Sequence, residues 1–118
     1  MKIYTDYYGN YKHWTPGAVP ISISRFPPAG YKGKECKMVA PEEWLLEAMK
    51  TGNITQEFYT KAYAKQLDSL GGPHVIMGVL EDISEGKDII LVCYEKDGDF
   101  CHRHLLKEYL ESCGFQGE

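Results

Sequence analysis

The sequence has no long hydrophobic run and no leader-like segment. None of its apolar stretches reaches membrane-spanning length, and Met1-Lys2 leads directly into a strand-like segment. We therefore expect no signal peptide, no membrane anchor and no membrane partner. The chain also lacks a basic excess: its net charge of -4 at pH 7 argues against a general nucleic-acid coat, while a local basic patch is compatible with it.

Several common motifs of catalysis and phosphate binding are absent. GxxxxGK[ST], GxGxxG and HExxH do not occur, which disfavours an ATPase, a standard dinucleotide fold and a metalloprotease. The four cysteines, Cys36, Cys93, Cys101 and Cys113, show no CxxC spacing. We interpret them as free thiols of a cytoplasmic protein in a reducing compartment.

The composition is that of a globular chain. Apolar residues make up 43% and charged residues 25%, which is enough apolar surface for an ordinary core. We expect one domain over residues 1–118, since nothing repeats and no linker or low-complexity segment interrupts the chain.

Strand-like and helix-like segments alternate. Strands are predicted over 2–8, 18–25 and 89–94. The first helix is predicted from Pro41 to Gly52, and a second helix follows an N-cap at Thr55. Two further helices are predicted from Pro73 to Gly86 and from near Phe100 to Gly114. This alternation predicts an α/β layer structure with a short, mostly parallel sheet of three to four strands and about four helices. The link over residues 9–17 is short for a crossover helix, so it is either a single helical turn or the first two strands are not neighbours.

The last strand and helix carry the most unusual residues. Cys101, His102 and Arg103 fall in the predicted first turn of the helix, where Asp and Glu are the usual choice because the helix dipole is positive there. Unpaired backbone N–H groups, a guanidinium and a thiol together favour an anion, a thiolate or a metal.

The carboxyl ends of the predicted strands face the start of this helix. Ligands of open parallel sheets bind outside these ends. The residues there, which we take as candidate ligand-binding and catalytic residues, are Tyr7, Arg25, Phe26, Pro27, Cys93, Tyr94 and Glu95.

Three segments carry a family resemblance. CYEKxxxFCHRHLL, with the strand end ISISRFPP and the start KIYTDYYGN, resembles the domain of unknown function 488 family, small CHR-motif α/β proteins of bacteria, archaea and phages. The matching positions are Cys93, Glu95, Cys101, His102, Arg103, Arg25 and Pro27. The resemblance covers nearly the whole chain and implies a Rossmann-like fold. It implies no activity.

Each candidate also has a structural interpretation. Arg25 and Arg103 either clamp one anion or pair internally with Glu95. Glu95 acts as a general base, orients a ribose hydroxyl or pairs with Arg103. The rings of Tyr7, Tyr94 and Phe26 stack on a base or form core and pocket wall.

The cysteines leave three interpretations open. Cys101 is a nucleophile with His102 as base, a buried small residue, or a redox or metal residue. One feature opposes the nucleophile: successive side chains on a helix point about 100° apart, so Cys101 and His102 should not face each other well. Thiolate and imidazole suit zinc, but no CxxC or HxxxH pair sets tetrahedral geometry. No cofactor is identified.

The lead hypothesis is a cytoplasmic domain that binds a phosphate-bearing ligand, a nucleotide or nucleic acid, at the strand ends. An enzyme acting on that ligand is compatible with it. The first alternative is a non-catalytic interaction module with a buried Arg/Glu/Cys network, and the second is a thiol enzyme using Cys101.

Overall fold

The fold is seen in a computed structural model, which describes residues 1–94, 101–112 and 114. Glu95 and Phe100, to which the sequence assigned a candidate role and a helix start, lie outside the described residues, as does Cys113.

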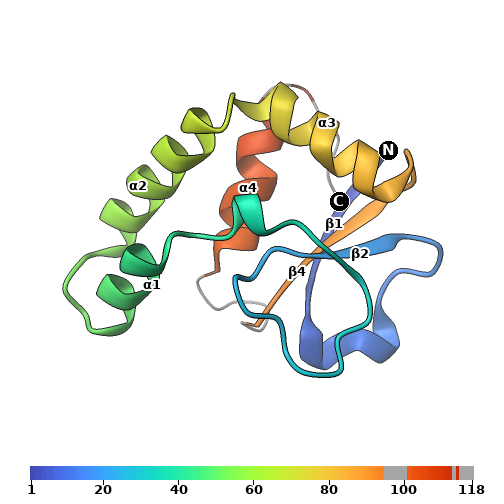
Figure 1. Cartoon of the computed structure of the whole chain (residues 1–118), viewed down its shortest axis with the longest axis horizontal. Helices are drawn as coiled ribbons and strands as arrows, with labels where there is room; N and C mark the ends of the chain where they lie inside the picture. Colours follow the sequence, from blue (N-terminus) through green and yellow to red (C-terminus); the bar gives the residue numbers. More distant parts are fainter. Residues whose placement is uncertain (95–100, 113, 115–118) are drawn as a thin grey trace.

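The fold contains a four-stranded parallel sheet (Figure 1). Its strands are β1 (Ile3–Tyr7), β2 (Val19–Ser22), β3 (Lys34–Glu35) and β4 (Ile89–Cys93), in the order β1-β4-β2-β3. With the helices around it, this sheet confirms the predicted small α/β, Rossmann-like fold.

Four α-helices complete the fold, and α4 packs on β1 and β4: α1 (Glu43–Lys50), α2 (Gln56–Ser69), α3 (Pro73–Ser84) and α4 (His102–Glu111). Two short 3-10 segments accompany them, η1 (Tyr8–His13) and η2 (Lys37–Val39). The N-cap predicted at Thr55 is confirmed, because its side chain accepts a hydrogen bond from the backbone N–H of Phe58 at 3.0 Å. None of the described helices is both long and apolar enough to cross a bilayer.

Strand β4 is buried along its whole length, as its apolar run predicted. Ile89, Leu91 and Cys93 alternate with Ile90 and Val92, so these two sets point to opposite faces of the sheet. The first set belongs to the main core, together with side chains of α2, α3 and α4. Cys93 therefore points toward the helices.

The other face of the sheet is covered by an aromatic group. The small Ser22 of β2 allows a close approach here, since the Tyr8 hydroxyl lies 2.6 Å from its Oγ. The Tyr8 ring meets the edges of Tyr31 and Tyr94, with centroid distances of 5.4 and 4.8 Å.

The link over residues 9–17, between the first two strands, shows both of the arrangements that the sequence left open. The chain makes a short 3-10 segment after β1, and β1 and β2 are not neighbours because β4 lies between them. This central place brings the end of β4 beside the ends of β1 and β2, where Tyr7 is in register with Cys93 and Ser22 with Val92.

Candidate functional site

A pocket of about 530 Å³ opens at the carboxyl ends of the strands. Its lining comes from the segment after β2, from α1 and α2, from the residue after β4 and from the start of α4: Ser24, Arg25, Phe26, Pro41, Leu46, Met49, Lys50, Tyr59, Tyr94, Cys101 and His102. We call it the strand-end pocket. Five of the residues singled out in the sequence, Arg25, Phe26, Tyr94, Cys101 and His102, are brought together here.

Arg25 is anchored at one side of its guanidinium group. Nε donates to the carbonyl of Pro41, and Nη2 donates to the carbonyls of Ala40 and Pro41, at 3.1 to 3.2 Å. Within the described chain, Nη1 has no hydrogen-bond partner. The head group is thus fixed in position while one nitrogen keeps its donor capacity.

Arg103 lies elsewhere. Its side chain is fully buried, its Nη1 donates to Sγ of Cys93 at 3.3 Å, and its guanidinium carbon lies 6.0 Å from the ring centre of Tyr7. Neither Arg103 nor Tyr7 lines the strand-end pocket, and Pro27 does not line it either. The two arginines are therefore not brought to one anion in this structure.

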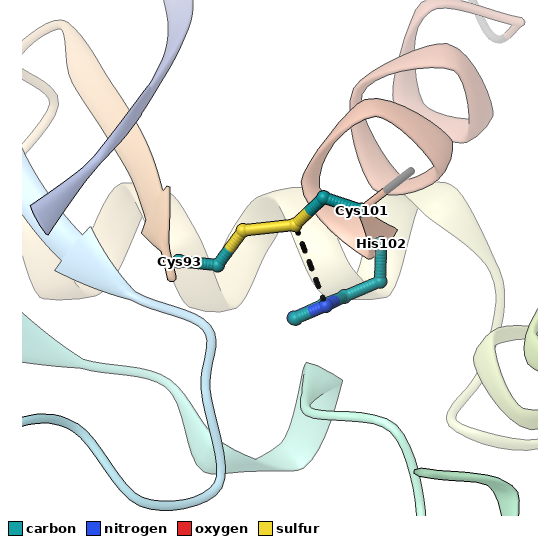
Figure 2. Close-up of side chains that lie close together, drawn as sticks. All are labelled: Cys93, Cys101 and His102. Atoms are coloured by element: carbon teal, nitrogen blue, oxygen red, sulfur yellow. Dashed lines mark hydrogen bonds between the residues drawn. A yellow bond between two sulfur atoms is a disulfide. The ribbon is translucent and has the colours of Figure 1, made fainter. Parts of the chain in front are cut away.

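A disulfide joins Cys93 to Cys101 (Figure 2). The prediction of free thiols is wrong for this pair, whereas Cys36 is free and buried. The spacing of eight residues gave no CxxC signal. The two sulfurs meet because one ends a central strand and the other starts the helix that packs on β1 and β4.

The prediction that Cys101 and His102 face away from each other is also wrong. Cys101 is the N-cap of α4 and has an extended backbone, φ -148° and ψ 143°, so the helical offset of about 100° does not apply to it. Its Sγ lies 3.9 Å from Nδ1 of His102, as the dashed line in Figure 2 marks.

His102 is a buried, neutral imidazole. Its Nε2 lies 2.7 Å from the carbonyl oxygen of Ile23, which can only accept, so Nε2 carries the proton. The pKa of His102 is lowered from 6.5 to about 4: burial lowers it most, the hydrogen bond to Ile23 raises it, and the nearby Arg103 charge lowers it. Nδ1 is then an unprotonated acceptor that faces Cys101.

Cys93, Cys101 and His102 also have the side-chain types of a metal site. Their Sγ and ring nitrogen atoms all lie within 4.8 Å of one another, and all three residues are buried. In this structure the two sulfurs are bonded to each other, and the cationic Arg103 contacts one of them. Both features oppose metal binding. A metal is bound by thiolates, which a disulfide does not offer, and the positive charge of Arg103 would repel a metal cation.

Two aromatic rings lie at the pocket in exposed positions. Phe26 is 66% exposed and Tyr94 is 52% exposed, and the Tyr94 hydroxyl donates to the carbonyl of Phe26. This hydrogen bond ties the segment after β2 to the residue after β4. Both rings remain accessible to solvent at the pocket.

Sequence reasoning missed two polar residues of the pocket. Lys50 comes from the last turn of α1, far from the other candidates in the chain, and no motif marks it. Ser24 lies within the predicted strand over residues 18–25 and was not singled out as a candidate. The strand-end position of Ser24, directly before Arg25, was the available signal.

Comparison with known proteins gives one finding. A family model, DUF488-N3a, described as the active DUF488-N3 subclade, matches residues 3–114. No curated protein and no solved structure shows significant similarity to the chain.

Proposed function

The chain belongs to the DUF488 family, in its active N3 subclade, and from that premise we propose that it binds a nucleotide in the strand-end pocket. The observation that carries the proposal is the composition of the pocket wall. Among the described lining residues, Arg25 and Lys50 are cations and none is an Asp or Glu. A pocket with positive side chains and no carboxylate favours an anionic ligand.

The phosphate is assigned to the cationic side. Arg25 has a fixed guanidinium with Nη1 available, which suits a charge-assisted hydrogen bond to a phosphate oxygen. Lys50 adds a second charge at the end of α1. The start of α4 adds the positive end of a helix dipole and has no acidic residue in its first turn.

The base is assigned to the aromatic side. Phe26 and Tyr94 present accessible rings of the kind on which bases stack. Ser24 adds a small polar residue to the pocket lining on this side. The volume of about 530 Å³ suits one nucleotide better than an extended strand.

The test is a ligand panel with charge variants. Nucleoside monophosphates and diphosphates at millimolar concentration should raise the melting temperature of the wild-type protein, because a ligand of the folded state stabilises it by mass action. Isothermal titration should then show about tenfold weaker binding for Lys50→Ala, since a charge-assisted contact is lost. Arg25→Ala should weaken binding at least as much.

Lys87→Ala is the matched control. Lys87 is exposed and precedes β4, at the opposite end of the strand from the pocket, so the same loss of charge there should leave binding unchanged. Equal weakening by Lys87→Ala and Lys50→Ala would show a diffuse charge effect. Binding of oligonucleotides without mononucleotides would favour a nucleic-acid ligand, and no binding of either would favour the non-catalytic interaction module.

A further inference from the structure

We propose that Cys93 and Cys101 form a thiol–disulfide exchange pair, in which an incoming thiol attacks Cys101 and Cys93 leaves as the thiolate. This activity goes beyond nucleotide binding and does not depend on it. It rests on the two sulfurs having different surroundings.

Access distinguishes the two sulfurs. Cys101 is only 3% exposed, but it lines the strand-end pocket, so a reactant in the pocket lies beside it. Cys93 is fully buried at the end of β4 and does not line the pocket. In Figure 2 the bond runs from the end of the strand to Cys101, the residue before the helix, with the His102 ring beside the Cys101 sulfur. An incoming thiolate therefore reaches Cys101 first.

The charge beside Cys93 makes it the better leaving group. Nη1 of the buried Arg103 donates to Cys93 Sγ at 3.3 Å, and a guanidinium keeps its charge at any physiological pH. A nearby cation stabilises a thiolate, and exchange is faster when the departing sulfur has the lower pKa. Attack at Cys101 places the new negative charge on Cys93, next to Arg103.

His102 acts on the other sulfur. Its Nδ1 is an acceptor because Nε2 donates to Ile23, and it lies 3.9 Å from Cys101 Sγ. After reduction, the S–H of Cys101 can donate to this nitrogen. Cys101 is then a thiol at the pocket, and Cys93 is the thiolate that can attack a mixed disulfide on Cys101.

The chemistry needs a thiol as the second reactant. A thiolate RS⁻ attacks Cys101 Sγ, forms RS–S–Cys101 and breaks the bond to Cys93, which keeps the electron pair. A second RS⁻ attacks the sulfur of R, releases RS–SR and leaves Cys101 as a thiolate, which takes a proton from water. Two thiols are oxidised and one protein disulfide is reduced; in the reverse direction, Cys93 resolves a mixed disulfide on Cys101.

The substrate class is a small thiol such as glutathione, or a cysteine of another protein. Disulfides of reducing compartments are usually transient and take part in catalysis or redox sensing. A pair with one sulfur at a pocket and the other beside a cation fits such a use better than a permanent cross-link.

The experiment equilibrates the full chain in buffers of varying reduced to oxidised glutathione ratio, quenches with acid, alkylates the free thiols and maps them by mass spectrometry. Cys93 and Cys101 should change together, with a midpoint inside the range of glutathione ratios. In Cys93→Ser, which cannot resolve, oxidised glutathione should leave a stable mixed disulfide on Cys101. In Cys101→Ser, modification of Cys93 should be at least about tenfold slower, because Cys93 is buried.

Two further variants test the assigned roles. Arg103→Met should slow reduction of the native protein by about tenfold, while Arg103→Lys, which keeps a positive charge, should slow it less. Cys36→Ser is the control and should behave as the wild type. Variants at Arg103 that do not fold leave the trapping result in Cys93→Ser as the deciding one.

Three results would overturn the proposal. The first is a mixed disulfide that forms on Cys93 as readily as on Cys101. The second is a pair that resists glutathione until the protein is unfolded, as a structural cross-link would. The third is a reduced protein that takes up one zinc ion and loses it in Cys93→Ser, Cys101→Ser and His102→Gln alike, which would make the cluster a metal site.

Discussion

At the scale of single residues, His102 shows how burial sets the state of an ionisable group. The ring packs edge-on against Tyr63, whose hydroxyl donates to the carbonyl of Val39. Nε2 lies on the Ile23 carbonyl, and the ring is almost fully buried, so its charged form is poorly stabilised. It therefore stays neutral in the folded protein at neutral pH.

This neutrality predicts a pH dependence of stability. The pKa of His102 is about 4 in the folded state and 6.5 when unfolded, so between these values the unfolded chain binds a proton that the folded chain does not. The contribution is fully present above about pH 6.5 and is lost as the pH falls toward 4. Its size is on the order of 3 kcal/mol. Urea denaturation at a series of pH values measures it.

Two variants test whether His102, rather than another histidine, causes this pH dependence of stability. His102→Gln removes the ring, so its free energy of unfolding should change less between pH 7 and pH 4 than that of the wild type. His13→Gln replaces an exposed histidine of η1 and should keep the wild-type pH dependence. An equal pH dependence in the wild type and His102→Gln would contradict the buried, neutral state.

The sequence predicts single residues well where the signal is local. The buried position of Cys93 follows from an apolar run that suits a central strand. The contact between Cys101 and His102 does not follow, because it depends on Cys101 being the N-cap rather than a helical residue. Lys50 could not be predicted as a pocket residue, since only the packing of α1 beside the strand ends brings it there.

At the scale of elements, helices with a capping residue or an initial proline are the most predictable. Thr55 caps α2 and Pro73 opens α3, as expected from their positions. Strand β3 was missed: it has two residues, both exposed, so it has neither an apolar run nor an alternating pattern. It forms because the loop after β2 returns alongside that strand.

The contribution of the α2 N-cap to stability can be tested by mutation. Thr55→Ala should lower the free energy of unfolding by about 1 kcal/mol, because the hydroxyl accepts from the Phe58 N–H and this donor has no partner within the helix. Thermal or urea unfolding measures the change.

Thr60→Ala is the control within the same helix. The Thr60 hydroxyl donates to the carbonyl of Gln56, which is already part of the helix, and alanine is the better helix former. We expect no loss of stability. A loss at Thr60 as large as that at Thr55 would show that the cap is not the cause.

At the scale of the whole molecule, the strand order decides where the site lies. The sequence predicted parallel strands with reactive residues at their carboxyl ends, but the order could not be predicted because each strand pairs through backbone atoms that carry no sequence signal. With β4 between β1 and β2, the ends of three strands and the start of α4 form one corner. The strand-end pocket and the disulfide share that corner.

We propose that this corner binds a nucleotide, and the most direct test is to locate a bound nucleotide by NMR. Titration of a nucleoside monophosphate into isotopically labelled protein should shift the backbone amides of Ser24, Phe26, Tyr94 and His102, while those of Lys32 and Gly33, in the loop before β3, should not move. Shifts confined to that loop, or no shifts at millimolar ligand, would contradict the account.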